Sequence, residues 1–330
     1  PPPPPPPPSF FLHPPQAIPD SVASRGLGDV YKRQVRTIAA SICGSDLHML
    51  DTGWAMHAFP AMAGHPGHEA VGEVVQSRST RIAEGDVVLT TPHIWNSRCF
   101  AEYQAVDDAH VLKLSSDFDV DTITLAQQLG TVIYAAKRLP ATLEGQSCVV
   151  IGQGSAGLFW DFQLKSLGAE KIFSVEPLSW RRELGLSYGV DQAIDVTGAD
   201  AVHAVNDMTG GIGADLVVEA VGSTETLSQA FHFVRDEGSV VLFGLPESED
   251  PVPFDYSQMF KSRANAFTVL GSQDEAGLKS YAEAVHLISS GQIDVAPIIS
   301  HRVNIADIDR AFDVARERVD GAVKIGVTFD

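Results

Sequence analysis

The feature that most constrains the fold is one run, SCVVIGQGSAGLFWDFQLKSLGAEKIFSVEP, at residues 147–177. A short apolar stretch is followed by a glycine-rich turn, a helical stretch and a second apolar stretch. The apolar runs ADLVVEAVG and GSVVLFGLP come later, with helical stretches between them. Strands that are apolar throughout and alternate with helices are typical of a parallel sheet covered on both faces. We therefore expect an α/β fold with a doubly wound parallel sheet over residues 121–265.

The residues before this run have a different pattern. HEAVGEVVQS, GDVVLTT and CFAEYQAV are short β-like runs separated by glycine and charged turns, and VRTIAASICGSD predicts a strand that leads into a turn. Residues 35–120 are therefore predicted to form a β-rich domain. Residues 266–330 contain two helical stretches and a closing strand, and we expect them to return to this domain.

The N-terminal residues 1–34 begin with eight prolines and continue SFFLHPPQAIPDSVASRGLGDVYKRQ. Polyproline cannot join a helix or a central strand. We expect residues 1–34 to be a disordered or artefactual leader outside the fold.

Charge and cysteine content exclude several classes of partner and compartment. The formal net charge of −19 argues against nucleic acid or an anionic membrane as the main partner. The three cysteines, Cys43, Cys99 and Cys148, are widely spaced and do not form a disulfide framework, which fits a reducing cytoplasm. No apolar run approaches the roughly 20 residues of a membrane span.

The glycine-rich turn has the pattern G-x-G-x-x-G between a strand and a helix. Its first glycine permits a tight turn, the second lets the backbone approach a pyrophosphate, and the third lets the helix pack closely on the strand. The N-terminus of the following helix attracts negative charge. The turn therefore predicts a dinucleotide site at Gly152, Gly154, Ser155, Ala156 and Gly157.

The nicotinamide cofactor that fits this turn depends on Glu176, which ends the next strand. An acidic side chain there accepts hydrogen bonds from the adenosine ribose and repels a 2′-phosphate, so we expect NAD rather than NADP. A solvated charge at the strand end is the structural alternative for Glu176. Arg181 and Arg182 follow closely, and Arg181 is included in the predicted cofactor site because a cation there weakens the exclusion of NADP.

A second group of residues has the chemistry of a metal site. Cys43 begins CGSDLH, and His68 and Glu69 lie in AGHPGHEAVGEVV. Thiolate, imidazole and carboxylate are the ligand types that zinc accepts in a tetrahedral site with one open position. Taken alone, Cys43 is more often a core residue, and His68–Glu69 is a common strand pair. Their combination with a nucleotide turn favours a catalytic metal site.

Five segments together make the chain resemble the zinc-dependent medium-chain dehydrogenase/reductases, the group of alcohol, polyol and threonine dehydrogenases. They are ICGSDLH, GHEAVGEVV, VVIGQGSAGL, ADLVVEAVG and DGAVKIGV. The resemblance runs from about Val35 to Asp330. It implies a GroES-like β-barrel catalytic domain, a Rossmann domain, an active site in the cleft between them, and a homodimer or homotetramer.

The resemblance also implies roles for individual residues at the metal. Cys43 and His68 match the catalytic zinc ligands, and Glu69 matches a third ligand of the polyol-type members. Asp46 matches the carboxylate that orients the metal-bound histidine. In many members a glutamate or cysteine follows the barrel, and Gln127 stands in that place. Either Glu69 completes the site, or the metal is held weakly, or there is no metal.

Other residues are implied at the substrate and the cofactor. Ser45 matches the hydroxyl residue that hydrogen-bonds the substrate alcohol, and His48 matches the histidine that passes its proton onward. Trp54 is expected to line an apolar substrate pocket. Val221 and Gly244, at the ends of two predicted strands, are expected at the cofactor.

The family's four-cysteine structural zinc lobe is missing, because GDVVLTTPHIWNSRCFAEYQ has only one cysteine. The resemblance therefore implies one catalytic zinc, NAD, and the reversible oxidation of a secondary alcohol or polyol to a ketone. Two alternatives stay open at this point. One is a zinc-free NAD(P)H-dependent reductase of the same superfamily, and the other is a nucleotide-binding protein without catalytic activity.

Overall fold

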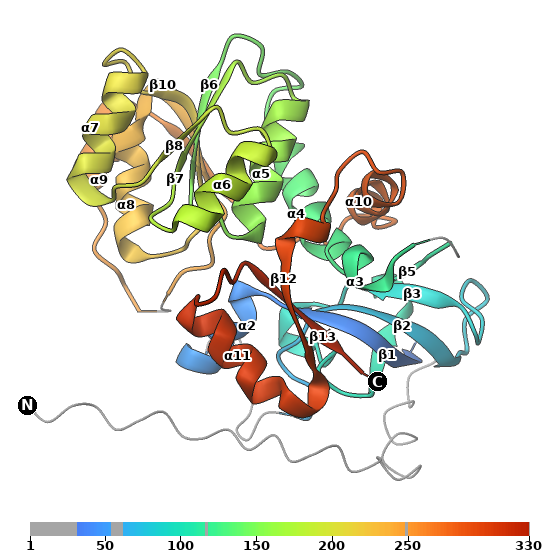
Figure 1. Ribbon diagram of the computed structural model, residues 1–330. Coiled ribbons are helices and arrows are strands. Elements are labelled where there is room, and N and C mark those ends of the chain that lie inside the picture. The colour runs from blue at the N-terminus through green and yellow to red at the C-terminus, as the bar shows by residue number, and fades with distance from the viewer. Residues whose placement is uncertain (1–31, 54–61, 116–117, 248–249, 330) are drawn as a thin grey trace, which may run out of the picture. The chain divides into compact units, whose positions relative to one another are not determined.

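The computed structural model describes residues 32–53, 62–115, 118–247 and 250–329 (Figure 1). These residues divide into two compact units. The first unit comprises the described residues up to 124 together with 301–319 and 325–329, and the second comprises 125–300 and 320–324. Among the described residues, no helix is long and apolar enough to cross a membrane.

The second unit is built on a six-stranded sheet in the order β11-β10-β9-β6-β7-β8, and all neighbouring strands are parallel. Its central strands are buried almost throughout, as their continuous apolar sequences predict. The doubly wound sheet expected from the sequence is therefore confirmed. The strands are β6 (Ser147–Ile151), β7 (Lys171–Val175), β8 (Gln192–Ile194), β9 (Ala214–Glu219), β10 (Val234–Leu242) and β11 (Asn265–Thr268).

Helices cover both faces of this sheet (Figure 1). One face carries α5 with α4 and α6, and the other carries α8 with α7 and α9. The apolar core between the sheet and the second set includes Val149, Phe231 and Phe233. The helices of the unit are α4 (Ala126–Ala136), α5 (Ser155–Ser166), α6 (Ser179–Ser187), α7 (Gly198–Met208), α8 (Thr224–Phe233), α9 (Tyr256–Ser262) and α10 (Lys279–Ser289).

The strand order creates a switch point in this sheet. The chain leaves β6 toward β7 and β8, and it then returns to β9 on the other side of β6. Ile151 and Glu219 are register partners at the carboxyl ends of these two strands. Ligands of open α/β sheets bind beyond the carboxyl ends at such a point, where the loops of the two strands diverge. The glycine-rich turn follows β6 directly and so lies at this position.

The first unit is built on a seven-stranded sheet in the order β12-β13-β1-β2-β3-β5, with β4 also paired to β1. Its helices are short, and Val35, Val74 and Val88 form part of its apolar core. The strands are β1 (Lys32–Ile42), β2 (Glu69–Gln76), β3 (Val87–Thr90), β4 (Tyr103–Asp107), β5 (Val111–Lys113), β12 (Ile299–Asn304) and β13 (Lys324–Thr328), and the helices are α2 (Gly44–Thr52), α3 (Val120–Ile123) and α11 (Ile308–Glu317).

Three residues assigned to the leader belong to the fold instead. Strand β1 begins at Lys32, and Lys32 to Gln34 pair with Asp107 to Ala105 of β4 in antiparallel register. Pairing of this kind uses main-chain N–H and C=O groups, so the polar sequence KRQ does not prevent it. The sequence boundary between residues 34 and 35, drawn from side-chain pattern alone, is therefore three residues too late.

The return of the chain to the first unit also lies later than residue 266. Residues 266–300 stay in the second unit, where α10 packs on α4. A Cβ atom on Gly130 would lie 2.4 Å from the ring of Tyr281, so the two helices touch at a glycine. This close packing holds the segment in the second unit up to Ser300.

Candidate active site

The stretch CGSDLH, expected as a turn, forms the start of helix α2. Cys43 is the N-cap residue, and the side chain of Asp46 accepts a hydrogen bond from its backbone N–H at 2.8 Å. An acidic side chain three residues into a helix satisfies one of the N–H groups that the first turn leaves without a partner. The three-residue spacing from Cys43 to Asp46 thus has a local structural reason. It lets Asp46 cap the first turn of α2, and this places Cys43 at the N-terminus of the helix.

Cys43, His68 and Glu69 come together in the first unit. One ligand atom from each residue lies within 4.8 Å of the others. Cys43 follows β1, and Glu69 begins the neighbouring strand β2, so the pairing of the two strands creates the cluster. His68 and Glu69 are buried, with exposed fractions of 5% and 0%, and Cys43 is half-buried.

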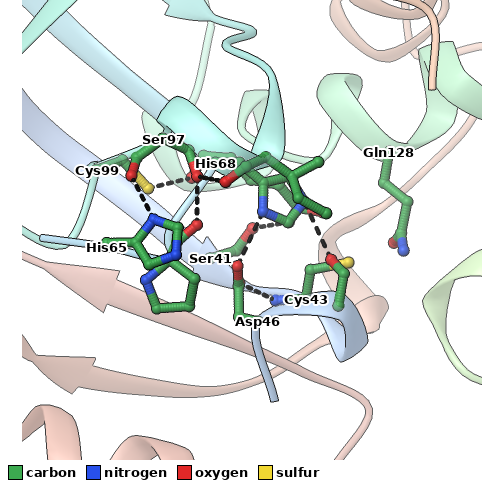
Figure 2. Close-up of polar contacts among 12 residues, drawn as sticks. Ser41, Cys43, Asp46, His65, His68, Ser97, Cys99 and Gln128 are labelled. Atoms are coloured by element: carbon green, nitrogen blue, oxygen red, sulfur yellow. Dashed lines mark hydrogen bonds and ion pairs between the residues drawn. The ribbon is translucent and has the colours of Figure 1, made fainter. Parts of the chain in front are cut away.

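The ring of His68 is held in one orientation by its neighbours. Its Nδ1–H donates to Oδ1 of Asp46 at 2.8 Å (Figure 2). Its Nε2 lies 3.3 Å from the hydroxyl of Ser45. Burial opposes protonation of His68, but the charge and hydrogen bond of Asp46, together with Cys43, raise its pKa well above the usual value. The same contacts leave Nε2 as the nitrogen that can bind a metal.

The residues of this cluster fit zinc. They offer a sulfur, a nitrogen and a carboxylate oxygen, and a carboxylate stands behind the histidine as in many zinc sites. Cys99 has a different environment. Burial raises the pKa of its thiol well above the usual value, and the thiol donates to the main-chain oxygen of Glu69 at 3.6 Å. Cys99 therefore supports the strand beside the cluster as a neutral thiol.

Three other residues predicted at the site are His48, Gln127 and Trp54. His48 lies in α2, one turn after Ser45, and is half-buried. Gln127 is buried in α4, which belongs to the second unit, so its role beside the metal stays a prediction. Trp54 lies outside the described residues.

The glycine-rich turn has the geometry that its sequence predicts. Gly152 has a φ of +88°, which favours glycine. A Cβ atom on Gly157 would lie 1.9 Å from the carbonyl oxygen of Gly152. Ser155 begins helix α5, and Ala156 lies in its first turn. A Cβ atom on Gly154 would meet only the guanidinium of Arg181, at 3.8 Å. The third glycine therefore closes the turn on itself, while the second leaves room for a ligand.

Glu176 is a buried part of this turn and not a solvated charge, since only 4% of it is exposed. Its carboxylate accepts from the backbone N–H of Gln153 at 2.9 Å and of Leu178 at 3.0 Å. Arg181 donates to the carbonyl of Ala322 within the same unit. The fixed negative charge beside the glycine turn is consistent with recognition of ribose hydroxyl groups.

Val221 and Gly244 lie with the glycine turn at the carboxyl edge of the sheet. A Cβ atom on Gly152 would lie 2.6 Å from the side chain of Val221, and one on Gly244 would lie 2.1 Å from the backbone nitrogen of Gly222. Glu219 holds this region together, because its carboxylate accepts from the N–H groups of Val221 and Gly222. The predicted cofactor residues are thus brought together at the switch point, and the turn fits a dinucleotide.

Known proteins share both parts of this arrangement. The family model described as "Alcohol dehydrogenase GroES-like domain" matches residues 31–116, and that described as "Zinc-binding dehydrogenase" matches residues 158–290. The L-threonine 3-dehydrogenase of Pyrococcus abyssi is 30% identical over 92% of this chain and 92% of its own length. The chain belongs to the zinc-type medium-chain dehydrogenase/reductases. The family resemblance drawn from the sequence is therefore confirmed.

A second relative and a solved structure extend the comparison. The L-threonine 3-dehydrogenase of Bacillus velezensis is 26% identical over 88% of this chain and 89% of its own. The alcohol dehydrogenase TADH from Thermus sp. ATN1 has the same fold, with a TM-score of 0.77, 24% identity, and coverage of 92% of this chain and 94% of its own. This medium-chain dehydrogenase is thus an oxidoreductase that acts on CH–OH groups of a small molecule, and its family uses zinc and a nicotinamide dinucleotide.

The sequence did not single out Ser41, which contacts Glu69 across the paired strands β1 and β2. Both strands were expected, but their register was not, because no short hairpin turn connects them to fix it. Small polar residues in strands are common, so a serine two positions before Cys43 carries no signal of its own.

Proposed function

We propose that this protein is a zinc-dependent, NAD-linked dehydrogenase that oxidises a secondary alcohol or polyol to a ketone and catalyses the reverse reaction. The observation that carries the proposal is the convergence of Cys43, His68 and Glu69 within 4.8 Å, with Asp46 bound to the far nitrogen of His68. A site of this composition with an open position is typical of catalytic zinc. The glycine turn supplies the second requirement, a place for the dinucleotide.

Two kinds of residue would hold the metal, its direct ligands and the group that orients one of them. Cys43, His68 and Glu69 would be its ligands, and Asp46 fixes the ring of His68 so that Nε2 faces them. Bound zinc supplies a Lewis acid that lowers the pKa of an alcohol, and bound NAD supplies the hydride acceptor. Burial of His68 and Glu69 keeps water away from two of the three ligands.

Ser45 is suited to receive the proton of the substrate hydroxyl. Its hydroxyl lies 3.3 Å from Nε2 of His68, so it stands next to the atom that faces the metal position. A hydroxyl can accept one proton while it donates another, which makes it a relay rather than a final acceptor. His48 lies one helical turn further along α2 and is proposed as the group that takes the proton onward.

NAD is the proposed cofactor rather than NADP because of Glu176. Its carboxylate is fixed by two backbone N–H groups beside the glycine turn, and it would repel a 2′-phosphate. The guanidinium of Arg182 donates to the carbonyls of Glu176 and Pro177, and that of Arg181 donates to Ala322. These main-chain contacts turn both guanidinium groups toward the protein's own carbonyls.

The substrate class follows from the relatives only as a proposal. The curated relatives reported above are L-threonine 3-dehydrogenases, a name that describes a reaction on a small hydroxylated molecule. We therefore place the substrate of this chain among small secondary alcohols, including polyols and hydroxy amino acids. A homodimer or homotetramer belongs to the same proposal.

Metal content tests the proposal directly. Purified protein should contain about one zinc per chain by elemental analysis, as expected for a single catalytic site. The variant Cys43→Ala should lose the metal, whereas Cys148→Ala, at a buried cysteine of β6, should retain it. A screen of secondary alcohols with NAD and with NADP should then give turnover with NAD that disappears in Cys43→Ala.

Two outcomes would contradict the proposal. Folded, NAD-binding protein without zinc that reduces carbonyl compounds would identify the zinc-free reductase. Gln127 favours this alternative, because a neutral amide stands where many members of the family have a glutamate or cysteine. Protein that binds NAD but turns over no alcohol or ketone, with or without zinc, would instead be a nucleotide-binding protein without catalytic activity.

A further inference from the structure

Ser41 and Glu69 face each other across strands β1 and β2. The two residues are register partners in the antiparallel pair, so their side chains lie on the same face of the sheet. The hydroxyl of Ser41 donates to Oε2 of Glu69 at 2.5 Å, and the exposed fraction of each residue is 0%. Ser41 is two residues before Cys43, at the end of the strand that delivers the thiol.

A buried carboxylate needs fixed donors around it. Removing Glu69 from water disfavours its charge unless hydrogen bonds or a cation compensate. The hydroxyl of Ser41 is one such donor, and it restricts the rotation of the carboxylate because its own strand is locked by backbone pairing. Groups that hydrogen-bond a metal ligand fix its orientation. Their removal commonly weakens metal binding by roughly 10- to 100-fold.

We propose that Ser41 is a positioning residue that holds the carboxylate of Glu69 toward the metal and thereby sets the zinc affinity of this chain. The inference rests on the proposed function, since it takes Glu69 as a ligand. It adds that the third ligand is controlled by a serine on the opposite strand. In the same way that Asp46 orients His68, Ser41 orients Glu69, so each buried ligand has a partner of its own.

The alternative is that Ser41 is a small strand residue whose hydroxyl has no effect on the metal. A zinc titration of metal-depleted protein in competition with a chromophoric chelator separates the two. We expect Ser41→Ala to weaken zinc binding by about 10- to 100-fold, and Ser41→Thr, which keeps a hydroxyl, to restore most of the affinity. Ser174→Ala is the matched control, because Ser174 is a fully buried serine in β7 of the other sheet.

Two further measurements ask whether Ser41 acts through Glu69. Adding Ser41→Ala to Glu69→Gln should cause no further loss of zinc affinity, since residues that act as one unit are not additive. Cobalt bound in place of zinc should show a changed visible spectrum in Ser41→Ala and the wild-type spectrum in Ser41→Thr. Circular dichroism and thermal unfolding of each variant would show that the comparison is made between folded proteins.

Three results would count against the inference or its basis. Wild-type zinc affinity and an unchanged cobalt spectrum in Ser41→Ala would overturn it. A full additional loss in the double variant would show that Ser41 does not act through Glu69, which would overturn it as well. Failure of the wild-type protein itself to bind zinc would overturn the proposed function, and this outcome is distinct because it precedes any variant.

Discussion

Asp46 and His68 form a buried pair in which Nδ1–H of the imidazole donates to Oδ1 of the carboxylate at 2.8 Å. The other oxygen of Asp46 accepts from the backbone N–H of Cys43, also at 2.8 Å. One carboxylate therefore fixes two of the three candidate ligands, the ring of His68 and the helix start that carries Cys43. This arrangement decides which nitrogen of the imidazole faces the metal position.

Replacing Asp46 by asparagine should weaken zinc binding by about 10- to 100-fold. The amide of Asn has one acceptor oxygen, so it can serve His68 or the backbone of Cys43 but not both. Chelator competition measures the change. Asp86→Asn, which neutralises a carboxylate paired with Lys113 in the same unit, should leave zinc affinity unchanged. Equal affinity in the wild type and Asp46→Asn would contradict the role given to Asp46.

The glycines of the dinucleotide turn should separate folding from cofactor binding. Gly157→Ala would place a Cβ atom 1.9 Å from the carbonyl oxygen of Gly152, so we expect it to lower the free energy of unfolding by about 1–3 kcal/mol. Gly154→Ala meets only the guanidinium of Arg181, at 3.8 Å, and should leave stability nearly unchanged. It should instead weaken NAD binding, because the pyrophosphate needs close approach to this backbone.

Chemical denaturation and NAD titration of the two variants check this prediction together. Equal loss of stability in Gly154→Ala and Gly157→Ala would show that the two glycines have the same structural role. Unchanged NAD affinity in a folded Gly154→Ala protein would place the dinucleotide away from this turn.

Much of this fold could be predicted from the sequence because local pattern determines it. The continuous apolar strands around Val149 and Val217 and the turn at Gly152 each specify their structure within a few residues. What the sequence did not specify depends on pairing between distant segments. Strand β1 extends back to Lys32 because β4 is there to accept its main chain, and the KRQ side chains give no indication of this.

In the candidate site, too, local features could be predicted from the sequence and contacts between distant segments could not. Cys43, His68 and Glu69 were predicted from residue type and resemblance, and the structure brings them together. The contact of Ser41 with Glu69 could not be predicted, since it depends on the register of two strands that are separated by α2 and the following segment. Ligand identity is thus visible in the sequence, whereas the contacts that orient the ligands need the tertiary structure.

The carboxylate of Glu176 should determine the preference for NAD. In Glu176→Gln the negative charge disappears while an oxygen remains to accept from the backbone of Gln153. We expect NAD affinity to fall about tenfold, the order of one hydrogen bond to a charged group, and NADP affinity to rise relative to it. Binding titrations with both cofactors measure the ratio. Glu170→Gln, at an exposed position before β7, is the control and should leave the ratio unchanged.

Asp161 gives the fold a pH dependence that is unrelated to the metal. It lies in α5, the helix that follows the glycine turn, and its exposed fraction is 0%. Burial raises the pKa of Asp161 well above the usual value, and the neighbouring side chain of Gln153 offsets this only in part. The folded protein therefore holds a proton on Asp161 at pH values where the unfolded chain has lost it.

The sign of the effect on stability follows from this difference in bound protons. Above the ordinary aspartate pKa and up to the raised folded-state pKa, the folded state binds more protons than the unfolded state, so stability falls as pH rises. The contribution of Asp161 has a slope of up to about 1.4 kcal/mol per pH unit in that window. Asp161→Asn carries no ionisable proton and should lack this slope, so its stability advantage over the wild type should grow from mildly acidic to neutral pH.

Denaturant unfolding at a series of pH values measures this advantage. Asp195→Asn, at an exposed position after β8 in the same unit, should show no growing advantage and serves as the control. Parallel stability curves for the wild type and Asp161→Asn would mean that Asp161 is ionised in the folded protein and stabilised by partners. If the curves diverge, the buried carboxyl group of Asp161 lowers the free energy of unfolding at neutral pH, and asparagine at this position gives the more stable protein.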